Sequence, residues 1–322
     1  MTPKQIETQL NLWGNLEGGK ATLINLSENH TFRIDTPDGE KHILRIHRPN
    51  YQTHDAIKSE LLWLKALQQD TDLSLINPLK GANGELVQQV MLDNGQKTYA
   101  VRFKFEAGRE ADENDEHELK TLFAHLGHFA ATTHAHVEKW QQPTGFSRPT
   151  WDANAILDKN GLWGDWRKAP NVNGEIKTTL QNAEKKLHQT LSAYGKSKDK
   201  FGLIHADMRL ANILYDNKKS RLIDFDDCGF GWFAYDFAAA VSFFEHAKIV
   251  PELKQIWLKA YRKTRPFSRQ DETIIDAMVM LRRMALLAWI QSHNETNLAQ
   301  SYAKDFAVNS AKLAGRFLEN FS

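Results

Sequence analysis

Short apolar runs in the second half of the chain constrain its fold more than any other feature. Phe201–Ile204 leads directly into the sequence HADMRLAN, and two further runs follow at Ala211–Tyr215 and Arg221–Phe225. Runs of this length, bounded by polar turns, predict short strands joined by loops. A strand, loop and strand in this order would bring Asp224 back beside Asn212. We therefore expect the chain to fold around one cluster of polar side chains.

The residue types in that cluster are the ones that ATP-dependent phosphoryl transfer requires. One aspartate orients the acceptor hydroxyl and takes its proton, while an asparagine and a second aspartate hold Mg²⁺ through oxygen atoms. Asp207 is the predicted catalytic residue, and Asn212 and Asp224 are the predicted metal ligands. His205 is expected to brace the loop. For Asp226, a further metal ligand and a solvated acidic turn both stay open.

The N-terminal region has the pattern of an antiparallel sheet with one helix. Residues 21–48 alternate apolar and polar positions around a Pro-Asp-Gly turn, which is typical of hairpins. Residues 55–69 place apolar side chains on one face and predict a helix with Asp55 as its N-cap. Strand-like runs follow at 86–92 and 98–105. The first region is therefore expected to be mostly sheet.

The remainder of the chain has helical spacing. Predicted helices begin after residue 112 and cover 173–194, 235–248, 251–263, 271–293 and 297–319. The fold class is therefore predicted as α+β, because strands come first and helices follow. We expect an N-terminal nucleotide-binding lobe at 1–105 and a larger, mostly helical catalytic and substrate-binding lobe at 106–322.

Composition narrows the functional classes. Apolar residues make up 41% and charged residues 25% of the 322 residues, without an apolar stretch long enough to span a membrane. The net charge is +1 and no basic stripe is present, which argues against nucleic-acid binding. The polar N-terminus and the single cysteine, Cys228, favour a cytoplasmic protein. The oligomeric state stays open.

Two segments carry a resemblance to a known family. LIHADMRLANIL (203–214) and LIDFDDCGFGWFAYDFA (222–238) are similar to the aminoglycoside phosphotransferase and choline kinase family. The resemblance implies a protein-kinase-like, two-lobed fold and phosphorylation of a small-molecule hydroxyl, carried by an amino alcohol, a homoserine-like amino acid, a sugar or an aminoglycoside. It also implies that Tyr235-Asp236 anchors the catalytic loop, although Asp236 could equally be a helix N-cap.

The resemblance extends into the first lobe. Arg45, in LRIHRP, occupies the position of the family's strand residue that contacts the ATP phosphates. Glu60, on the next predicted helix, occupies the position of the ion-pair partner of that residue. The family usually has lysine where this chain has Arg45. Arginine keeps the charge and can bind phosphate bidentately, but it is bulkier. A surface cation on an exposed strand face is the alternative for Arg45.

Other nucleotide contacts are expected from backbone and loop positions. The chain lacks a glycine-rich loop, so the turn Ser27–His30 is expected to cover the phosphates, with Ser27 and Asn29 as contacts; a plain hairpin turn is the alternative. Adenine is expected against the lobe connection, Phe103–Ala107, including Phe105 and Ala107.

Substrate specificity is the least determined property. The Trp-rich insert at 146–168 could supply aromatic pocket walls or could pack against its lobe, and Arg282, Arg283, Trp289 and His293 on a late helix are candidate substrate contacts. A Ser/Thr protein kinase and a nucleotide-binding regulatory module with little turnover are the competing functions. The short segment between Asp224 and Tyr235 favours small substrates over peptides, and the intact Asp207 argues against the regulatory module.

Overall fold

The computed structural model describes residues 1–26, 29–112, 114–216 and 219–321, and the chain forms two compact units. The first unit contains residues 1–109, 142–148 and 216–226, and the second contains residues 110–141, 149–215 and 227–322. The first unit thus includes two segments from beyond residue 106. The predicted division into lobes at 105/106 stays a prediction.

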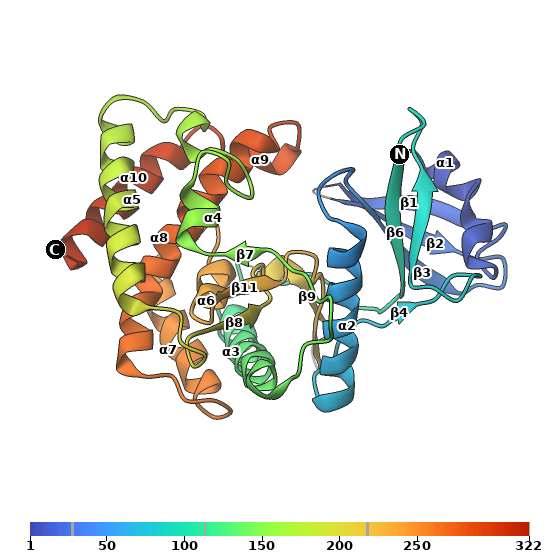
Figure 1. The fold of residues 1–322 in the computed structure, drawn as a ribbon, viewed down its shortest axis with the longest axis horizontal. Helices are drawn as coiled ribbons and strands as arrows, with labels where there is room; N and C mark the ends of the chain where they lie inside the picture. Colours follow the sequence, from blue (N-terminus) through green and yellow to red (C-terminus); the bar gives the residue numbers. More distant parts are fainter. Residues whose placement is uncertain (27–28, 113, 217–218, 322) are drawn as a thin grey trace. The chain divides into compact units, whose positions relative to one another are not determined.

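The first unit is built on an antiparallel sheet (Figure 1). Its strands run in the order β1–β2–β3–β6–β4, and β5 also pairs with β6. Their bounds are β1 Lys20–Leu26, β2 Asn29–Asp35, β3 Lys41–His47, β4 Pro78–Leu79, β5 Val87–Met91 and β6 Lys97–Lys104. β10, Ser220–Leu222, belongs to the same unit, where Leu222 bridges to Leu75. The hairpins predicted from period-two alternation are confirmed.

The alternation follows from burial on one face of this sheet. Side chains from neighbouring strands, among them Phe32, Ile34, Leu44 and Ile46, form one core with α1 (Pro3–Glu7) and the 3₁₀ helix η1 (Leu10–Trp13). Residues two positions apart point to the same face of a strand, so this core requires the alternating pattern.

Helix α2, His54–Asp70, confirms the predicted helix but not its cap. Thr53 is the N-cap, with an extended backbone and a side chain that accepts a hydrogen bond from the Ala56 N–H at 3.1 Å. Asp55 already lies in the first turn, where its charge complements the helix dipole. The prediction of Asp55 as the cap is wrong because Thr53 reaches the free N–H first.

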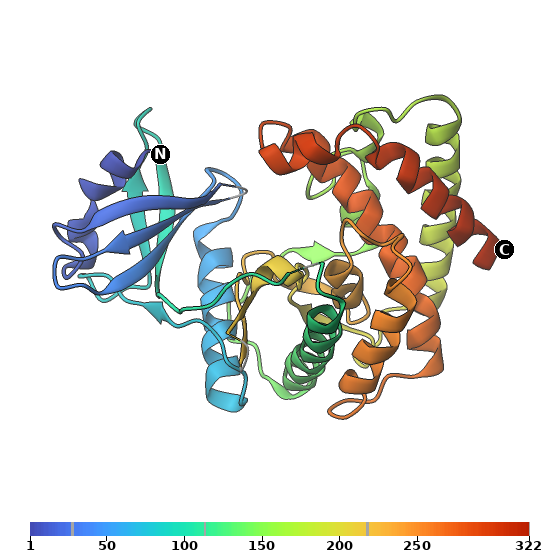
Figure 2. The ribbon, with the colours of Figure 1, turned by 180° about the vertical axis from the view of Figure 1, so that it is seen from behind.

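The second unit is mostly helical, with a small sheet in the order β7–β11–β8. Its helices are α3 Glu116–Lys139, α4 Ala153–Leu157, α5 Gly174–Tyr194, α6 Tyr235–Ala240, α7 Val250–Tyr261, α8 Arg269–Ser292, α9 Asn297–Tyr302 and α10 Phe306–Asn320. Its strands are β7 Thr150–Trp151, β8 Phe201–Ile204, β9 Ile213–Tyr215 and β11 Gly229–Trp232. α5, α8 and α10 pack side by side, and α3 packs along α7, as the two views show (Figures 1 and 2). Within the described ranges, the structure contains no helix long and apolar enough to cross a membrane.

Two predicted helices are shorter or divided. The helix expected at 235–248 ends at Ala240, and Phe243 has φ 77°, in the left-handed region. The helix expected at 297–319 is two helices, because the Asn171 amide donates to the carbonyls of Ala303 and Lys304 at 3.2 and 3.0 Å. These bonds satisfy carbonyl groups that have no partner within the helix where α9 ends. Because Asn171 is distant in sequence, the spacing of apolar residues at 297–319 does not indicate this break.

The elements around the predicted cluster are close to those expected. β8 coincides with the predicted run at 201–204, whereas the run at 211–215 divides into the 3₁₀ helix η3, Leu210–Asn212, and β9. β10 ends at Leu222, and Asp224 follows with φ 60°. Left-handed backbone at a residue that is not glycine ends a strand and costs about 1 kcal/mol.

Candidate functional site

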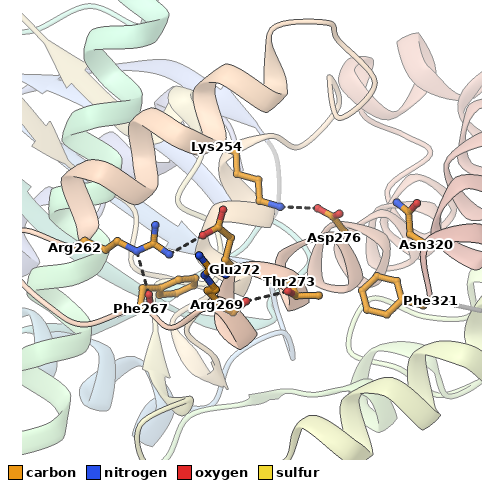
Figure 3. Close-up of a pocket in the computed structure, with 9 residues that line it drawn as sticks. All are labelled: Lys254, Arg262, Phe267, Arg269, Glu272, Thr273, Asp276, Asn320 and Phe321. Carbon is orange, nitrogen blue, oxygen red and sulfur yellow. Dashed lines mark hydrogen bonds and ion pairs between the residues drawn. The ribbon is translucent and has the colours of Figure 1, made fainter.

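One surface depression of the second unit lies away from every predicted site residue. It has a volume of about 850 Å³ and lies over α7, α8 and the end of α10 (Figure 3). Two ion pairs join residues of its lining, Lys254–Asp276 at 2.9 Å and Arg262–Glu272 at 2.7 Å. Four of its charged side chains are thus already partnered. The predicted site residues lie instead in two polar clusters, one in each unit.

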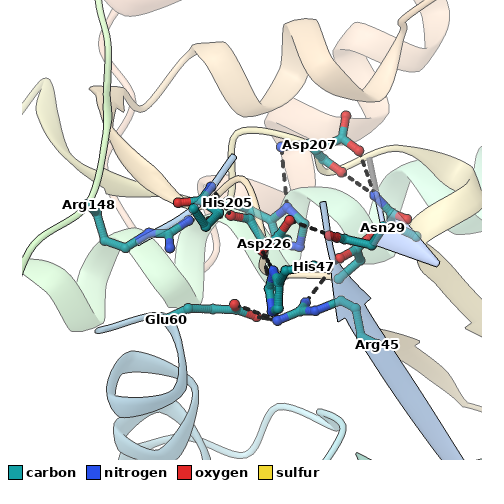
Figure 4. A network of polar contacts seen from close by, with 11 residues as sticks. Asn29, Arg45, His47, Glu60, Arg148, His205, Asp207 and Asp226 are labelled. Carbon is teal, nitrogen blue, oxygen red and sulfur yellow. Dashed lines mark hydrogen bonds and ion pairs between the residues drawn. The ribbon is translucent and has the colours of Figure 1, made fainter. Parts of the chain in front are cut away.

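The first cluster is centred on the pair of Arg45 and Glu60. The Arg45 Nη2 donates to both Glu60 carboxylate oxygens, at 2.8 and 2.6 Å, and Figure 4 shows the two groups facing one another. Arg45 is 5% exposed and Glu60 is 1% exposed. Arg45 lies on β3 between β2 and β6, opposite Thr31 and Val101, so the alternative of an exposed surface cation is wrong.

Electrostatics keep this pair charged. Burial opposes the charge of Arg45, but Glu60, Asp226 and Asp224 outweigh it and raise the Arg45 pKa above its ordinary value. Burial raises the pKa of Glu60, and Arg45 partly offsets that effect. Since removal of one partner leaves a buried, uncompensated charge, each partner requires the other.

Two aspartates of the segment 216–226 join this cluster. The Arg45 Nη1 donates to Asp224 Oδ1 at 3.3 Å, and its Nη2 lies 3.9 Å from Asp226 Oδ1. The Asp224 side chain is 44% exposed, so part of its carboxylate faces solvent. Asp226 is buried; burial opposes its charge, but Arg45 and His47 lower its pKa. The alternative of a solvated acidic turn at Asp226 is therefore wrong.

Asn29 and the segment before β7 hold Asp226 in place. The Asn29 amide donates to Asp226 Oδ2 at 2.8 Å, and Arg148 donates to the Asp226 backbone carbonyl (Figure 4). Asn29 lies at the start of β2, not in a turn, and Ser27 lies outside the described residues. The structure thus places Asn29 with Arg45 and Glu60. The sequence patterns indicate neither Arg148 nor His47: Arg148 lies outside every motif, and in LRIHRP the resemblance assigns a role to Arg45 alone.

The expected adenine contacts follow the sheet. Phe105 and Ala107 lie directly after β6, in a segment without regular secondary structure; Phe105 is half-buried and Ala107 is exposed. Glu106 between them pairs with Arg221 at 3.0 Å. The backbone of this segment can supply hydrogen bonds to a ligand because its strand pairing ends at Lys104.

The second cluster is centred on Asp207. Its Oδ1 accepts hydrogen bonds from Arg282 at 2.5 Å and Arg209 at 3.0 Å, and its Oδ2 accepts one from the Asn212 amide at 2.8 Å. Burial opposes the charge of Asp207, but Arg209, Arg282 and His205 outweigh it and lower its pKa to about 2. The structure therefore brings Asp207 and Asn212 together, with the carboxylate ionised and fixed.

The loop that carries Asp207 is anchored by Asp236. The Asp236 carboxylate accepts hydrogen bonds from the backbone N–H of Ala206 at 2.8 Å and of His205 at 3.2 Å. Its Oδ2 also lies 3.0 Å from His134 Nε2. The predicted anchoring of the loop is thus observed. The N-cap alternative is wrong, because Ala234 is the N-cap of α6 and Asp236 lies in its first turn.

His205 and the Trp-rich insert also have observed positions. His205 Nδ1 accepts a hydrogen bond from the Asp207 N–H at 3.3 Å, so it braces the loop as expected. In the insert, Trp151 donates to the Asp227 carbonyl at 2.7 Å, and the Trp163 ring lies 4.9 Å from the Arg282 guanidinium. Both tryptophans are buried. The part of the insert from residue 149 onward thus packs within the second unit.

The late helix α8 supplies one residue to this cluster. Of the four candidates there, Arg282 contacts Asp207, whereas Arg283 pairs with Glu245 at 2.6 Å. Trp289 and His293 stack on one another with ring centroids 5.0 Å apart. Two adjacent arginines inside an apolar helical run are the signal for buried, paired cations. Arg209 was missed, although it lies inside the motif itself.

The residues present fit a magnesium ion by donor chemistry. The Asn212 Nδ2 donates to the Asp207 carbonyl and to its carboxylate, both at 2.8 Å, which leaves the Asn212 Oδ1 as an oxygen ligand. Asp224, in the first unit, also carries carboxylate oxygens, the donor type that Mg²⁺ prefers. The part of the chain that the structure describes contains no group of three or more His, Cys, Asp or Glu side chains that could hold a metal. Mg²⁺ needs few protein ligands, because it keeps water and substrate phosphates.

Comparisons with known proteins agree with this chemistry. The sequence model described as "Phosphotransferase enzyme family" (APH) matches residues 21–267. Amicoumacin kinase of Bacillus subtilis (strain 168) is 26% identical over 281 residues, which cover 84% of this chain and 80% of that protein.

Two solved structures are similar to this chain in fold. The structure of the microcompartment-associated aminopropanol kinase has a TM-score of 0.90 and 35% identity, covering 98% of this chain and 97% of that one. Amicoumacin kinase hAmiN in complex with AMP-PNP, Ca²⁺ and Ami has a TM-score of 0.75 and 20% identity, covering 98% and 93%. The predicted protein-kinase-like α+β fold and the predicted resemblance are confirmed.

Proposed function

Since this chain belongs to the phosphotransferase enzyme family, we propose that it transfers the terminal phosphoryl group of ATP to a hydroxyl group of a small molecule. The observation that carries the proposal is the ionised carboxylate of Asp207, fixed by two arginines and by the Asn212 amide. Phosphoryl transfer depends on positioning and charge stabilisation more than on covalent chemistry, and a fixed carboxylate supplies positioning.

Asp207 is the proposed catalytic residue. Its carboxylate accepts a hydrogen bond from the acceptor hydroxyl and orients the oxygen for attack on the phosphorus. As the new O–P bond forms and the bond to the ADP oxygen breaks, the hydroxyl proton passes to Asp207. A carboxylate with a pKa of about 2 is a weak base, so orientation is its larger contribution.

Arg45 is the proposed phosphate contact, and Glu60 holds it in place. A guanidinium presents five N–H donors, so Arg45 can keep its bonds to Glu60 and still donate to a phosphate oxygen. We also propose Ser27 and Asn29 as phosphate contacts, and the backbone at Phe105 and Ala107 as the adenine contact. Each of these roles follows from the family resemblance and from the chemistry of the side chains.

Asn212 and Asp224 are the proposed ligands of Mg²⁺. A bound Mg²⁺ supplies positive charge that stabilises the phosphate oxygens during transfer. The Asn212 Oδ1 is held in one orientation by the two hydrogen bonds of its Nδ2, and the Asp224 carboxylate is held by Arg45. Both side chains can therefore bind the ion with little loss of rotamer entropy.

An amino alcohol is the acceptor class that the comparisons support best. The microcompartment-associated aminopropanol kinase is 35% identical over nearly the whole chain, a closer likeness than that to the amicoumacin kinases, at 26% and 20%. We further propose that the enzyme works in the cytoplasm, where ATP is available.

The test is ATP turnover with a panel of hydroxyl compounds. The panel contains 1-amino-2-propanol, ethanolamine, choline, homoserine and an aminoglycoside; ADP release and the phosphorylated product are both measured. We expect the highest kcat/KM with an amino alcohol, and a fall in kcat of about 10²–10⁴-fold for Asp207→Asn. Asp276→Asn, which makes the same chemical change at an exposed ion pair, is the control and should keep wild-type turnover. Equal turnover by wild type and Asp207→Asn would overturn the proposal.

A further inference from the structure

We infer that Arg282 is a positioning residue for phosphoryl transfer: it holds the Asp207 carboxylate and the Ala206 backbone in the geometry that the reaction needs. The inference rests on the proposed function, because it assumes that Asp207 faces the acceptor hydroxyl. Arg282 lies in the middle of α8, 75 residues from Asp207 in sequence, and no motif connects the two.

The guanidinium of Arg282 binds three different groups. Nη2 donates to Asp207 Oδ1 at 2.5 Å, Nη1 donates to the Ala206 carbonyl at 3.1 Å, and Nε donates to Ser242 Oγ at 3.1 Å. These bonds use separate N–H groups of one planar, rigid fork. A lysine at this position would keep the charge but could not hold all three groups at once.

The Ala206 backbone needs this support. Ala206 has φ 65°, a left-handed conformation that is unfavourable for a residue with a Cβ. Its N–H donates to Asp236 on α6, and its carbonyl accepts from Arg282 on α8. Such backbone persists only where surrounding groups hold it. Two oppositely charged side chains from two helices therefore hold both sides of the residue that precedes Asp207.

Arg282 also differs from Arg209, the other cation at Asp207. Arg282 is 1% exposed and lies against the rings of Trp163 and Tyr235, at 4.9 and 5.9 Å, whereas the Arg209 side chain is 26% exposed. A buried side chain packed by aromatic rings has one orientation, and its charge is screened little by water. Arg282 is therefore the fixed partner of the carboxylate.

The neighbouring arginine provides a matched control. Arg283 is 3% exposed; it donates to Glu245 at 2.6 Å and to Ser310 Oγ at 2.7 Å, and its guanidinium lies over the Phe306 ring. It is thus equally buried on the same helix but pairs with another carboxylate. A substitution there tests the loss of a buried cation without a change at Asp207.

The experiment compares Arg282→Met and Arg282→Lys with Arg283→Met, using the full chain with ATP, Mg²⁺ and the best acceptor of the panel. For Arg282→Met we expect kcat to fall about 10²-fold, since a small displacement of a catalytic group has that effect, with the KM for ATP within threefold. Arg282→Lys should restore less than a tenth of the lost activity, because it keeps the charge but not the three contacts.

The split between kcat and KM separates positioning from simple loss of stability. A folded Arg282→Met variant should lose kcat while its KM for ATP stays nearly unchanged, because the three bonds of Arg282 act on Asp207 and its loop. Arg283→Met should lower the urea midpoint but leave both kcat and KM unchanged.

The outcomes are distinguishable. A folded Arg282→Met variant with kcat within threefold of wild type overturns the inference, as does Arg283→Met with the same loss of kcat. If Arg282→Met does not fold, Arg282→Lys decides: near-wild-type kcat rejects the positioning role. Failure of the proposed function would give a different result. Either wild type would show no acceptor-dependent turnover, or Asp207→Asn would have the same turnover as wild type.

Discussion

Replacement of Asp236 by asparagine tests how firmly the catalytic loop is anchored. The wild-type carboxylate offers two oxygen acceptors to two backbone donors, the N–H of Ala206 at 2.8 Å and of His205 at 3.2 Å. Burial lowers the pKa of His134, so this ring is neutral; its Nε2–H donates to Asp236, and its Nδ1 accepts from the Tyr261 hydroxyl. All of these groups are buried, so water cannot replace a lost partner.

The magnitude follows from counting acceptors. Asparagine has one carbonyl oxygen, and its NH₂ group must face one of the former donors of Asp236. One buried N–H is then left unpaired, which costs about 1–3 kcal/mol, and the remaining bonds lose their charge-assisted strength, about 1 kcal/mol more. We therefore expect Asp236→Asn to lower the free energy of unfolding by about 3 kcal/mol. With an m-value of about 3 kcal/mol per molar urea, the midpoint falls by about 1 M.

Urea titration followed by far-UV circular dichroism and tryptophan fluorescence measures this change. Asp152→Asn is the matched control, because Asp152 caps α4 through a bond from the Ala155 N–H at 2.8 Å, and asparagine caps helices equally well. It should shift the midpoint by less than a third as much. A loss below about 1 kcal/mol in Asp236→Asn, comparable with the control, would refute the acceptor count.

Three further predictions concern packing, pH and metal. Gly127→Ala should lower the free energy of unfolding by about 1–3 kcal/mol in urea titration, because its Cβ would lie 2.4 Å from the Trp257 carbonyl oxygen. Burial lowers the pKa of His47 to about 3 in the folded chain, so between pH 6.5 and 3 only the unfolded chain binds this proton. Acidification therefore lowers the free energy of unfolding, and His47→Gln should make this decrease smaller. Asp226 acts in the same direction and remains in the variant. Asp224→Asn should raise the Mg²⁺ concentration for half-maximal turnover about tenfold, as measured by ADP release.

Local patterns predicted much of the fold. Period-two alternation places β1, β2 and β3 because one face of their sheet is buried in a single core. The run before His205 predicts β8 to the residue, since a short apolar run between polar turns has few other readings. The sequence also predicts two pairs of neighbouring site residues that the structure contains. These pairs are Asp207 with Asn212 and Arg45 with Glu60.

Tertiary contacts decide what the sequence patterns missed. The division between α9 and α10 depends on the Asn171 amide, which lies more than 130 residues away. Arg148 reaches the Asp226 carbonyl from a segment without periodicity, and Arg282 reaches Asp207 from the middle of an apolar helix. The local sequence indicates only that Arg282 is a cation in an apolar helical run. Because burial of an unpaired cation is costly, Arg282 needs an acidic partner, but the local sequence does not identify that partner.

The composition of the first unit limits how this chain can be divided. Its sheet and α2 come from residues 1–109. Two of the carboxylates around Arg45, those of Asp224 and Asp226, come from residues 216–226, as does the Phe225 ring beside Trp63. A fragment that ends at residue 109 would therefore retain the apolar core and lose counter-charges of a buried guanidinium. Expression of the N-terminal half alone should give an incomplete unit, and a split protein should regain it only when the later segment is supplied in trans.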